Sequence, residues 1–204
     1  MITIVDYGLG NILAFLNVYK RLDIPVCVAR NSSDLHGASK LIIPGVGAYD
    51  HAMKQLQQSG MRDTLDDLVV NQAVPVLGVC VGMQILGKAS EEGQLPGLGW
   101  IDGSVKKFDV SKFRQQTRLP HMGWNDVVPV SQSRLFAGLE SDARFYFLHS
   151  YYFQCEHREN VLAEAEYGTT FNCAVFSRNI HGVQFHPEKS HHFGTRLLKN
   201  FADL

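Results

Sequence analysis

The feature that most constrains the fold is a repeated order of short apolar runs and helix-like segments in the first half of the chain. The runs are rich in valine and isoleucine and lack the polar alternation of a half-exposed strand. Continuous apolar strands that alternate with helices indicate a parallel sheet covered on both faces. We expect strands at 2–5, 26–29, 40–43 and 74–79, and helices at 11–22, 49–58, 62–71 and 81–88.

The second half of the chain is richer in strand-like segments than in helices. We expect strands at 103–108, 125–130, 144–147, 151–155, 162–166, 173–177 and 180–184, then a final helix at 192–202. No internal repeat, low-complexity tract or flexible linker separates the halves. The sequence therefore predicts a single α/β domain over 1–204, with an open, mixed and largely parallel sheet flanked by helices.

Composition argues against several classes of function. With 19 Lys and Arg against 20 Asp and Glu, neither a nucleic acid nor a membrane surface is expected as partner. No run approaches the roughly 20 apolar residues of a membrane-spanning helix, and the first residues do not resemble a signal peptide. The cysteines lack CxxC spacing. We expect a cytoplasmic protein in which Cys27, Cys155 and Cys173 are packed as small hydrophobes.

The segment GVCVGMQ, residues 78–84, places Cys80 between two glycines at the end of a predicted strand. Small residues two positions before and after a nucleophile relieve the crowding of a sharp strand-to-helix turn and leave its side chain exposed. The helix expected after Cys80 would favour the thiolate through its dipole and free N–H groups. Taken alone, the motif leaves a core thiol and a nucleophile equally open.

Two further motifs offer partners for this thiol. In HPEKS, residues 186–190, His186 could exchange protons near neutral pH while Glu188 orients its ring, which would complete a Cys-His-Glu triad. The glycine-rich PGVG at 44–47 could stabilise an oxyanion together with the N–H group of Val81. For His186, the alternative is a histidine at a strand end whose hydrogen bonds are satisfied within a turn. For PGVG, the alternative is an ordinary glycine turn without a catalytic role. All these motifs follow predicted strands, and active sites of open α/β sheets form at such strand ends.

Other polar clusters carry less weight. His191 and His192 lie close to His186 and Glu188 in the sequence, but adjacent helix residues point about 100° apart, so we expect no metal site. The sparse basic residues at 114–118 indicate a solvated surface loop, and contact of this loop with a partner protein is the alternative.

Taken together, the motifs resemble those of the class I (triad) glutamine amidotransferases. That family carries a G-x-C-x-G elbow, an upstream PGxG segment and a downstream H-P-E, which occur here in that order over essentially the whole chain. The runs PHMGWN at 120–125, PGVGAY at 44–49 and HSYY at 149–152 look like those of the glutaminase subunits of imidazole glycerol phosphate synthases. The resemblance implies a flavodoxin-like sheet.

The resemblance also implies an activity, namely hydrolysis of L-glutamine to glutamate and ammonia by the triad, without a metal or organic cofactor. It implies an oxyanion hole formed by N–H groups of Val46 or Gly47 and of Val81. The residues it implies for glutamine binding are Gly45, Gln84, His149, Ser150 and Tyr151.

In this family the ammonia passes to a separate (β/α)8-barrel subunit, the cyclase, which makes imidazole glycerol phosphate and an aminoimidazole carboxamide ribotide. No such barrel fits in 204 residues, so we expect a heterodimer in histidine biosynthesis, with Asn11 and Trp124 near the interface. Trp124 is equally readable as a half-buried structural anchor. The Gly45–Val46 peptide could flip at low cost, which would make activity depend on the partner.

Three alternatives remain open from the sequence. The chain could be a paralogue that supplies ammonia to another synthase, such as one that aminates a surface sugar. It could be a catalytically silent scaffold on the same fold. A stand-alone cysteine hydrolase acting on peptides is disfavoured by the combination of HPEKS and HSYY.

Overall fold

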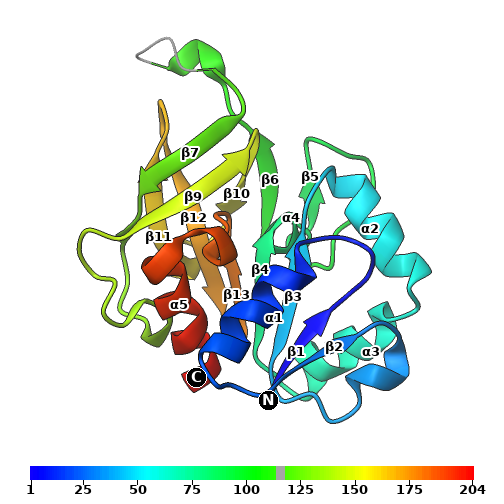
Figure 1. Ribbon diagram of the computed structural model, residues 1–204. Coiled ribbons are helices and arrows are strands. Elements are labelled where there is room, and N and C mark those ends of the chain that lie inside the picture. The colour runs from blue at the N-terminus through cyan, green and yellow to red at the C-terminus, as the bar shows by residue number, and fades with distance from the viewer. Residues whose placement is uncertain (114–117) are drawn as a thin grey trace.

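A mixed sheet forms the centre of the fold in the computed structural model, which describes residues 1–113 and 118–204 (Figure 1). Most of the predicted basic loop at 114–118 lies outside the described residues. The strands of the sheet are β1 (Ile2–Val5), β2 (Val26–Ala29), β3 (Leu41–Gly45), β4 (Val76–Cys80), β5 (Ala89–Ser90), β6 (Gly103–Lys107), β8 (Val128–Pro129), β10 (Tyr151–Cys155), β11 (Val161–Glu166), β12 (Thr170–Ser177) and β13 (Ile180–Val183).

The strand order is β2-β1-β3-β4-β13-β12-β10-β6-β5, with β11 paired to β12 and β8 paired to β11. The strands from β2 to β13 are parallel, and β12 begins an antiparallel region. A separate two-stranded sheet pairs β7 (His121–Asp126) with β9 (Arg144–His149) (Figure 1). The predicted fold class, an α/β mixed sheet flanked by helices, is confirmed.

The helices are α1 (Ile12–Arg21), α2 (Tyr49–Gln58), α3 (Arg62–Asp66), α4 (Val81–Gln84) and α5 (His191–Asp203). α3 continues as a π-helical turn, η2 (Asp67–Asn71). The single 3₁₀ turns are η1 (Ser32–Leu35), η3 (Val110–Lys112), η4 (Arg134–Phe136), η5 (Arg158–Asn160) and η6 (Pro187–Lys189). The connections β1-α1-β2 and β3-α2-α3-β4 step across the sheet in opposite directions. Because such crossovers are right-handed, α1 covers one face while α2 and α3 cover the other. α5 packs beside α1 (Figure 1).

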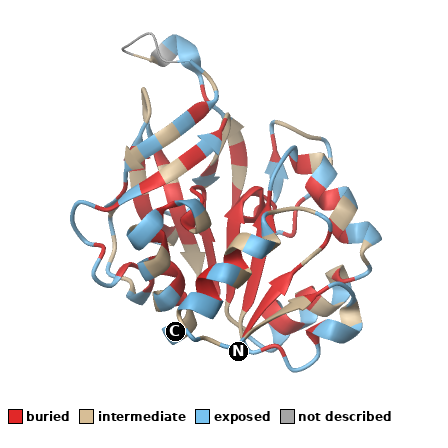
Figure 2. Cartoon of the chain, viewed as in Figure 1, coloured by how far each residue is buried: buried red, intermediate tan, exposed pale blue. Residues whose placement is uncertain are grey.

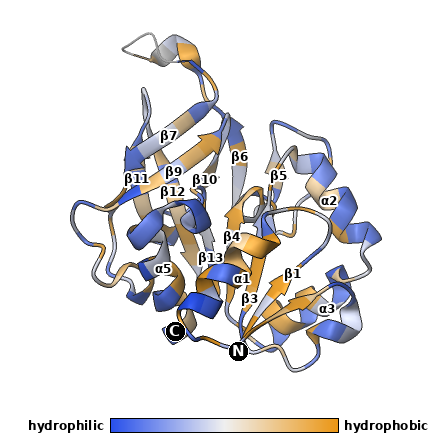
Figure 3. Ribbon diagram, in the orientation of Figure 1, coloured by the Kyte–Doolittle hydropathy of each residue, from blue (hydrophilic) through white to orange (hydrophobic). Residues whose placement is uncertain are grey.

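Burial follows this arrangement of layers (Figure 2). β1, β3, β4 and β13 are buried at every residue, as expected for parallel strands covered on both faces. Figure 3 shows β1, β3 and β4 as strongly apolar strands, whereas β13 includes the polar His181. β7 instead alternates between more buried and more exposed residues, which is typical of a strand with one face toward the interior.

Two predicted elements differ from the structure. The helix expected over 81–88 is a single turn, because the chain turns after Gln84 and enters the short strand β5, which pairs with β6. A methyl group at Gly87 would lie 2.7 Å from the Phe153 ring, and the N–H of Lys88 donates to the Gly103 carbonyl at 2.9 Å. The strand expected over 125–130 is divided between two strands: residues 125 and 126 end β7, whose pairing with β9 starts at His121, and Val128–Pro129 form β8.

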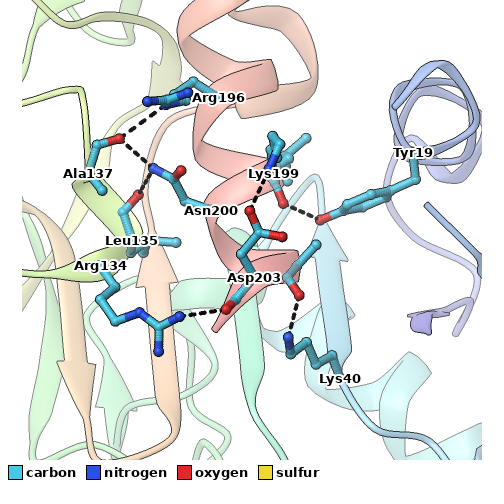
Figure 4. A network of polar contacts seen from close by, with 11 residues as sticks. Tyr19, Lys40, Arg134, Leu135, Ala137, Arg196, Lys199, Asn200 and Asp203 are labelled. Atoms are coloured by element: carbon cyan, nitrogen blue, oxygen red, sulfur yellow. Dashed lines mark hydrogen bonds and ion pairs between the residues drawn. The ribbon is translucent and has the colours of Figure 1, made fainter. Parts of the chain in front are cut away.

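The C-terminal end of α5 is held by polar side chains from neighbouring segments (Figure 4). Arg134 Nη2 donates to the Asp203 carbonyl at 2.7 Å, and Lys40 Nζ donates to the Ala202 carbonyl. Carbonyls in the last turn of a helix lack intrahelical donors, so these cations satisfy them and complement the helix dipole. The hydroxyl of Tyr19, on α1, donates to another carbonyl of α5 at 3.1 Å.

Candidate active site

Cys80 ends β4 in a strained backbone conformation, with φ of 56° and ψ of −115°. Residues other than glycine rarely adopt positive φ, and such strain typically costs about 1–3 kcal/mol. Close contacts explain both flanking glycines, because a methyl group at Gly78 would lie 2.5 Å from the Gly82 carbonyl oxygen, and one at Gly82 would lie 1.9 Å from that of Ile43. The structure therefore places Cys80 on a sharp turn, as the glycine spacing predicts.

His186 reaches Cys80 because β13 and β4 are parallel neighbours whose carboxyl ends adjoin. His186 Nδ1 lies 2.9 Å from Glu188 Oε1, and both side chains are at most 4% exposed. Burial alone would lower the pKa of His186, but hydrogen bonds to Cys80 and Glu188, together with electrostatic interaction with these two side chains, raise this pKa to about 10. The imidazole is therefore protonated at neutral pH, in contact with both predicted partners.

Gln184 is a neighbour of the sulfur that the sequence analysis missed. Its Nε2 lies 3.8 Å from Cys80 Sγ, and its Oε1 accepts a hydrogen bond from Gln84 Nε2 at 3.0 Å. Gln184 directly follows β13 and stands two residues before His186. Along an extended chain residues two apart lie on one side, so this spacing could have identified Gln184 from the sequence. Because α4 has only one turn, these side chains, more than a helix dipole, set the polarity around the sulfur.

A cavity of about 280 Å³ opens beside Cys80 and His186. Pockets for drug-sized molecules measure about 300–1,000 Å³, so this one suits a small ligand. The predicted residues that line it are Val46, Gly47, Val81, Gln84, His149, Ser150 and Tyr151. Residues that line it without having been predicted are Glu92, Pro120, Leu148 and Lys189. A larger hollow of about 920 Å³ at β8 and β11 contains none of the predicted site residues.

Four predicted residues lie outside this lining, and one of them, Glu188, still contacts the site through His186 Nδ1. Gly45 is buried behind the elbow, where a methyl group on it would lie 2.5 Å from the Gly82 nitrogen. Asn11 caps α1, its Oδ1 accepting from the Ala14 N–H at 3.3 Å. Trp124 is 41% exposed, and its ring stacks on that of His191 at 5.2 Å between centroids.

The hydroxyl of Tyr7 is buried behind the elbow, with no hydrogen-bond partner among the described residues. Removing an unsatisfied buried polar group is neutral or stabilising. We therefore expect Tyr7→Phe to raise the free energy of unfolding by up to about 1 kcal/mol in urea denaturation. Tyr19→Phe is the matched control, because it removes a hydroxyl that donates to Leu198, and it should lower that energy by about 1 kcal/mol. A destabilised Tyr7→Phe variant would contradict this reading.

The remaining cysteines are free thiols in the described structure. Cys173 is buried as predicted, while Cys27 and Cys155 are only half-buried. Among residues 1–113 and 118–204, no three His, Cys, Asp or Glu side chains are grouped to hold a metal ion. In the same part of the chain, no helix has the length and apolar character needed to cross a membrane.

The family is shown by comparison with known proteins. The family model described as "Glutamine amidotransferase class-I" matches residues 3–204. The chain therefore belongs to the class-I glutamine amidotransferases, and the resemblance in GVCVGMQ, PGVG and HPEKS is confirmed.

Individual relatives carry more specific names than the family model does. The chain is 61% identical to "Imidazole glycerol phosphate synthase subunit HisH" of Bdellovibrio bacteriovorus, over 100% of both chains. It is 52% identical to the protein of the same name from Leptospira interrogans, again over 100% of both chains. Identity to "Imidazole glycerol phosphate synthase subunit HisH 2" of Pseudomonas aeruginosa is 45%, with the same coverage.

Solved structures share the fold at low sequence identity. One described as "Crystal structure of glutamine amidotransferase" has a TM-score of 0.75 at 22% identity, covering 100% of this chain and 99% of that one. One subunit of a putative GMP synthase from Thermoplasma acidophilum has a TM-score of 0.73 at 21% identity, with coverages of 99% and 92%.

Proposed function

We propose that the protein hydrolyses L-glutamine to glutamate and ammonia at the Cys80 pocket, as the ammonia-producing subunit of an imidazole glycerol phosphate synthase in histidine biosynthesis. The observation that carries the proposal is the buried His186–Glu188 pair, in contact with a cysteine held on a strained turn. A nucleophile, a proton carrier and an orienting carboxylate are the parts that acyl transfer requires. The full-length relatives support the narrower assignment to one synthase.

In the first half-reaction, the Cys80 thiolate attacks the side-chain carboxamide carbon of glutamine. Negative charge then develops on the amide oxygen, and N–H groups of Val46 or Gly47 and of Val81, whose residues line the pocket, would stabilise it. The protonated His186 gives its proton to the leaving nitrogen, so that ammonia departs and a glutamyl thioester remains.

In the second half-reaction, the neutral His186 takes a proton from water, which attacks the thioester carbon. The tetrahedral intermediate collapses to glutamate and the Cys80 thiolate, and His186 is again protonated. Glu188 fixes the orientation of the ring through its 2.9 Å hydrogen bond in both steps. The cycle balances without a metal or organic cofactor.

Specificity for a free amino acid follows from the charges in the pocket. Apart from the catalytic Cys80 and His186, its lining contains one anionic side chain, Glu92, and one cationic side chain, Lys189, which match the ammonium and carboxylate of the ligand. The amide N–H groups of Gln84 already donate to the Tyr151 carbonyl and to Gln184 Oε1. Its Oε1 is therefore the atom that would accept from the ligand's ammonium group, with Ser150 and Tyr151 alongside.

The partner we propose is a cyclase subunit, forming a heterodimer in the cytoplasm. The outer face of β7 and β9 supports this, because Met122 and Trp124 pair with Leu148 and Tyr146 there. Met122 is 65% exposed, and Leu148 and Trp124 are 40% and 41% exposed. Leu148 also lines the pocket, so this apolar face begins at the mouth of the site. Trp124 is proposed as an interface residue on this basis and on the family resemblance, and Asn11 is proposed on the family resemblance alone.

Glutamate release should be low for the isolated protein and should rise when the cyclase and its ribonucleotide substrate are added. The reason is that the glycine-flanked Gly45–Val46 peptide could turn its N–H group into the pocket only in the assembled complex. Coupled turnover measured with each component left out checks the result. Structures with glutamine bound, with and without the cyclase, test the peptide, and identical orientations would refute the flip.

The alternatives make different predictions. A paralogue serving another synthase would co-purify and turn over with a different acceptor protein. A catalytically silent scaffold would fail to take a glutamine-analogue label at Cys80 even in the complex. The buried, correctly paired His186 and Glu188 favour the catalytic reading over the scaffold.

A further inference from the structure

The strands β7 and β9 carry different side chains on their two faces. The period of two along a strand puts Met122 and Trp124 on the exposed face and His121 on the buried face. On that buried face, His121 pairs in register with His149 of the pocket. The proposed function uses the exposed face and the pocket but assigns nothing to His121.

His121 is buried in an aromatic slot. Its ring stacks on Tyr167 at 4.0 Å and on Phe147 at 4.7 Å between centroids. Burial lowers the pKa of His121 to about 4. Burial also lowers the pKa of His149, to about 3, with the nearby His121 contributing. Both rings are therefore neutral at pH 7.

The hydrogen bonds around the two rings fix where each proton sits. His149 Nδ1 lies 2.8 Å from the Tyr151 carbonyl, which can only accept, so Nδ1 carries the proton. His149 Nε2 must then accept from His121 Nδ1 at 2.9 Å. His121 Nε2 is left to accept from Asn125 Nδ2 at 3.2 Å. Asn125 is oriented in turn, because Nδ2 donates to the Glu166 carbonyl at 2.8 Å and Oδ1 accepts from the Asp126 N–H at 2.9 Å.

This chain of donors ends at the glutamine pocket. The Tyr151 carbonyl accepts from His149 and also from Gln84 Nε2 at 3.2 Å. Gln84 connects through Gln184 to the Cys80 sulfur. One carbonyl oxygen thus joins the buried histidines to the one-turn helix that follows the nucleophile.

We propose that His121 is a positioning residue for glutamine hydrolysis, which holds His149 as its Nδ1–H tautomer and thereby fixes the Ser150–Tyr151 segment of the pocket. If the His149 ring flipped, or carried its proton on Nε2, the Tyr151 carbonyl would lose a hydrogen-bond donor. The Ser150–Tyr151 segment would then be free to move. The role concerns substrate binding more than chemistry, because no atom of His121 reaches the pocket lining. The inference rests on the proposed function.

Two substitutions at His121 separate hydrogen bonding from packing. His121→Phe keeps an aromatic ring in the slot but removes both hydrogen bonds. His121→Asn loses ring packing but can present an amide N–H near the position of Nδ1. In the complex with cyclase and its ribonucleotide, we expect His121→Phe to raise KM for glutamine about tenfold, the effect of one lost hydrogen bond, with kcat within about twofold. His121→Asn should keep KM closer to the wild-type value, even where its melting temperature is lower.

If His121→Phe kept the wild-type KM and His121→Asn raised it, the role of His121 would be packing, and the proposal would be overturned. Unchanged KM in both variants would overturn it as well. Independently, nitrogen NMR of the imidazoles at pH 7 should show Nδ1–H tautomers for both His121 and His149, and Nε2–H in either would contradict the chain. The tautomer does not depend on turnover. A wild-type complex that hydrolyses no glutamine would therefore count against the proposed function and not against the histidine pair.

Discussion

Cys80→Ala should reduce glutamine hydrolysis by the assembled complex at least about 10⁴-fold, because removing the nucleophile of a triad removes the covalent route altogether. Glutamine should still bind, since the side chains that match its charged groups are untouched. Calorimetric titration with glutamine, run beside the glutamate-release assay, measures both quantities on the same preparation.

Cys173→Ala is the matched control for that experiment. Cys173 is also a buried free thiol, but it lies in β12 outside the pocket lining. Its loss should cost about 1 kcal/mol of stability or somewhat more, through the small cavity that it leaves, and activity should remain. Undiminished hydrolysis by Cys80→Ala would sink the triad assignment.

Glu188→Gln should lower kcat by about 10²–10⁴-fold while leaving KM nearly unchanged. The amide is almost the same size as the carboxylate, but it removes the charge next to His186 and can present an N–H group to Nδ1, which favours the wrong tautomer. Lys189→Gln, at the next residue, is a control for charge at the pocket edge and should act mainly on KM. A Glu188→Gln variant with wild-type kcat would show that the orientation of His186 does not depend on this carboxylate.

The same substitution should change how stability depends on pH. The pKa of His186 is raised above its ordinary value of 6.5 to about 10 in the folded protein. Between these values His186 holds its proton in the folded protein and loses it in the unfolded chain, so the stability contributed by His186 falls as pH rises from about 6.5 to 10. Without the Glu188 charge the raised pKa should drop, so melting temperatures of Glu188→Gln should decline less steeply over this range. A parallel decline in wild type and variant would contradict the linkage.

The parallel part of the fold was predictable because its strands carry their signal locally. β1, β3 and β4 are buried on both faces, so their sequences read as continuous apolar runs. β7 was misplaced because its exposed face is itself apolar, which removes the polar alternation that marks a half-buried strand.

The candidate site also has a part that could be predicted from the sequence and a part that could not. Cys80, His186 and Glu188 could be named from the sequence because glycine spacing and strand ends are properties of short segments. The hydrogen bonds of Gln184 to Gln84 and of His121 to His149 join residues 100 and 28 positions apart. Such contacts depend on strand register, which a single sequence leaves open.

The strained backbone at Cys80 has a consequence for protein engineering. Glycine adopts positive φ without steric penalty, so a glycine at this position would relax the turn while removing the sulfur. A library of variants ranked by thermal stability alone would therefore tend to enrich inactive molecules at this position. Selections for a more thermostable variant of this protein therefore need to measure ammonia release as well as melting temperature.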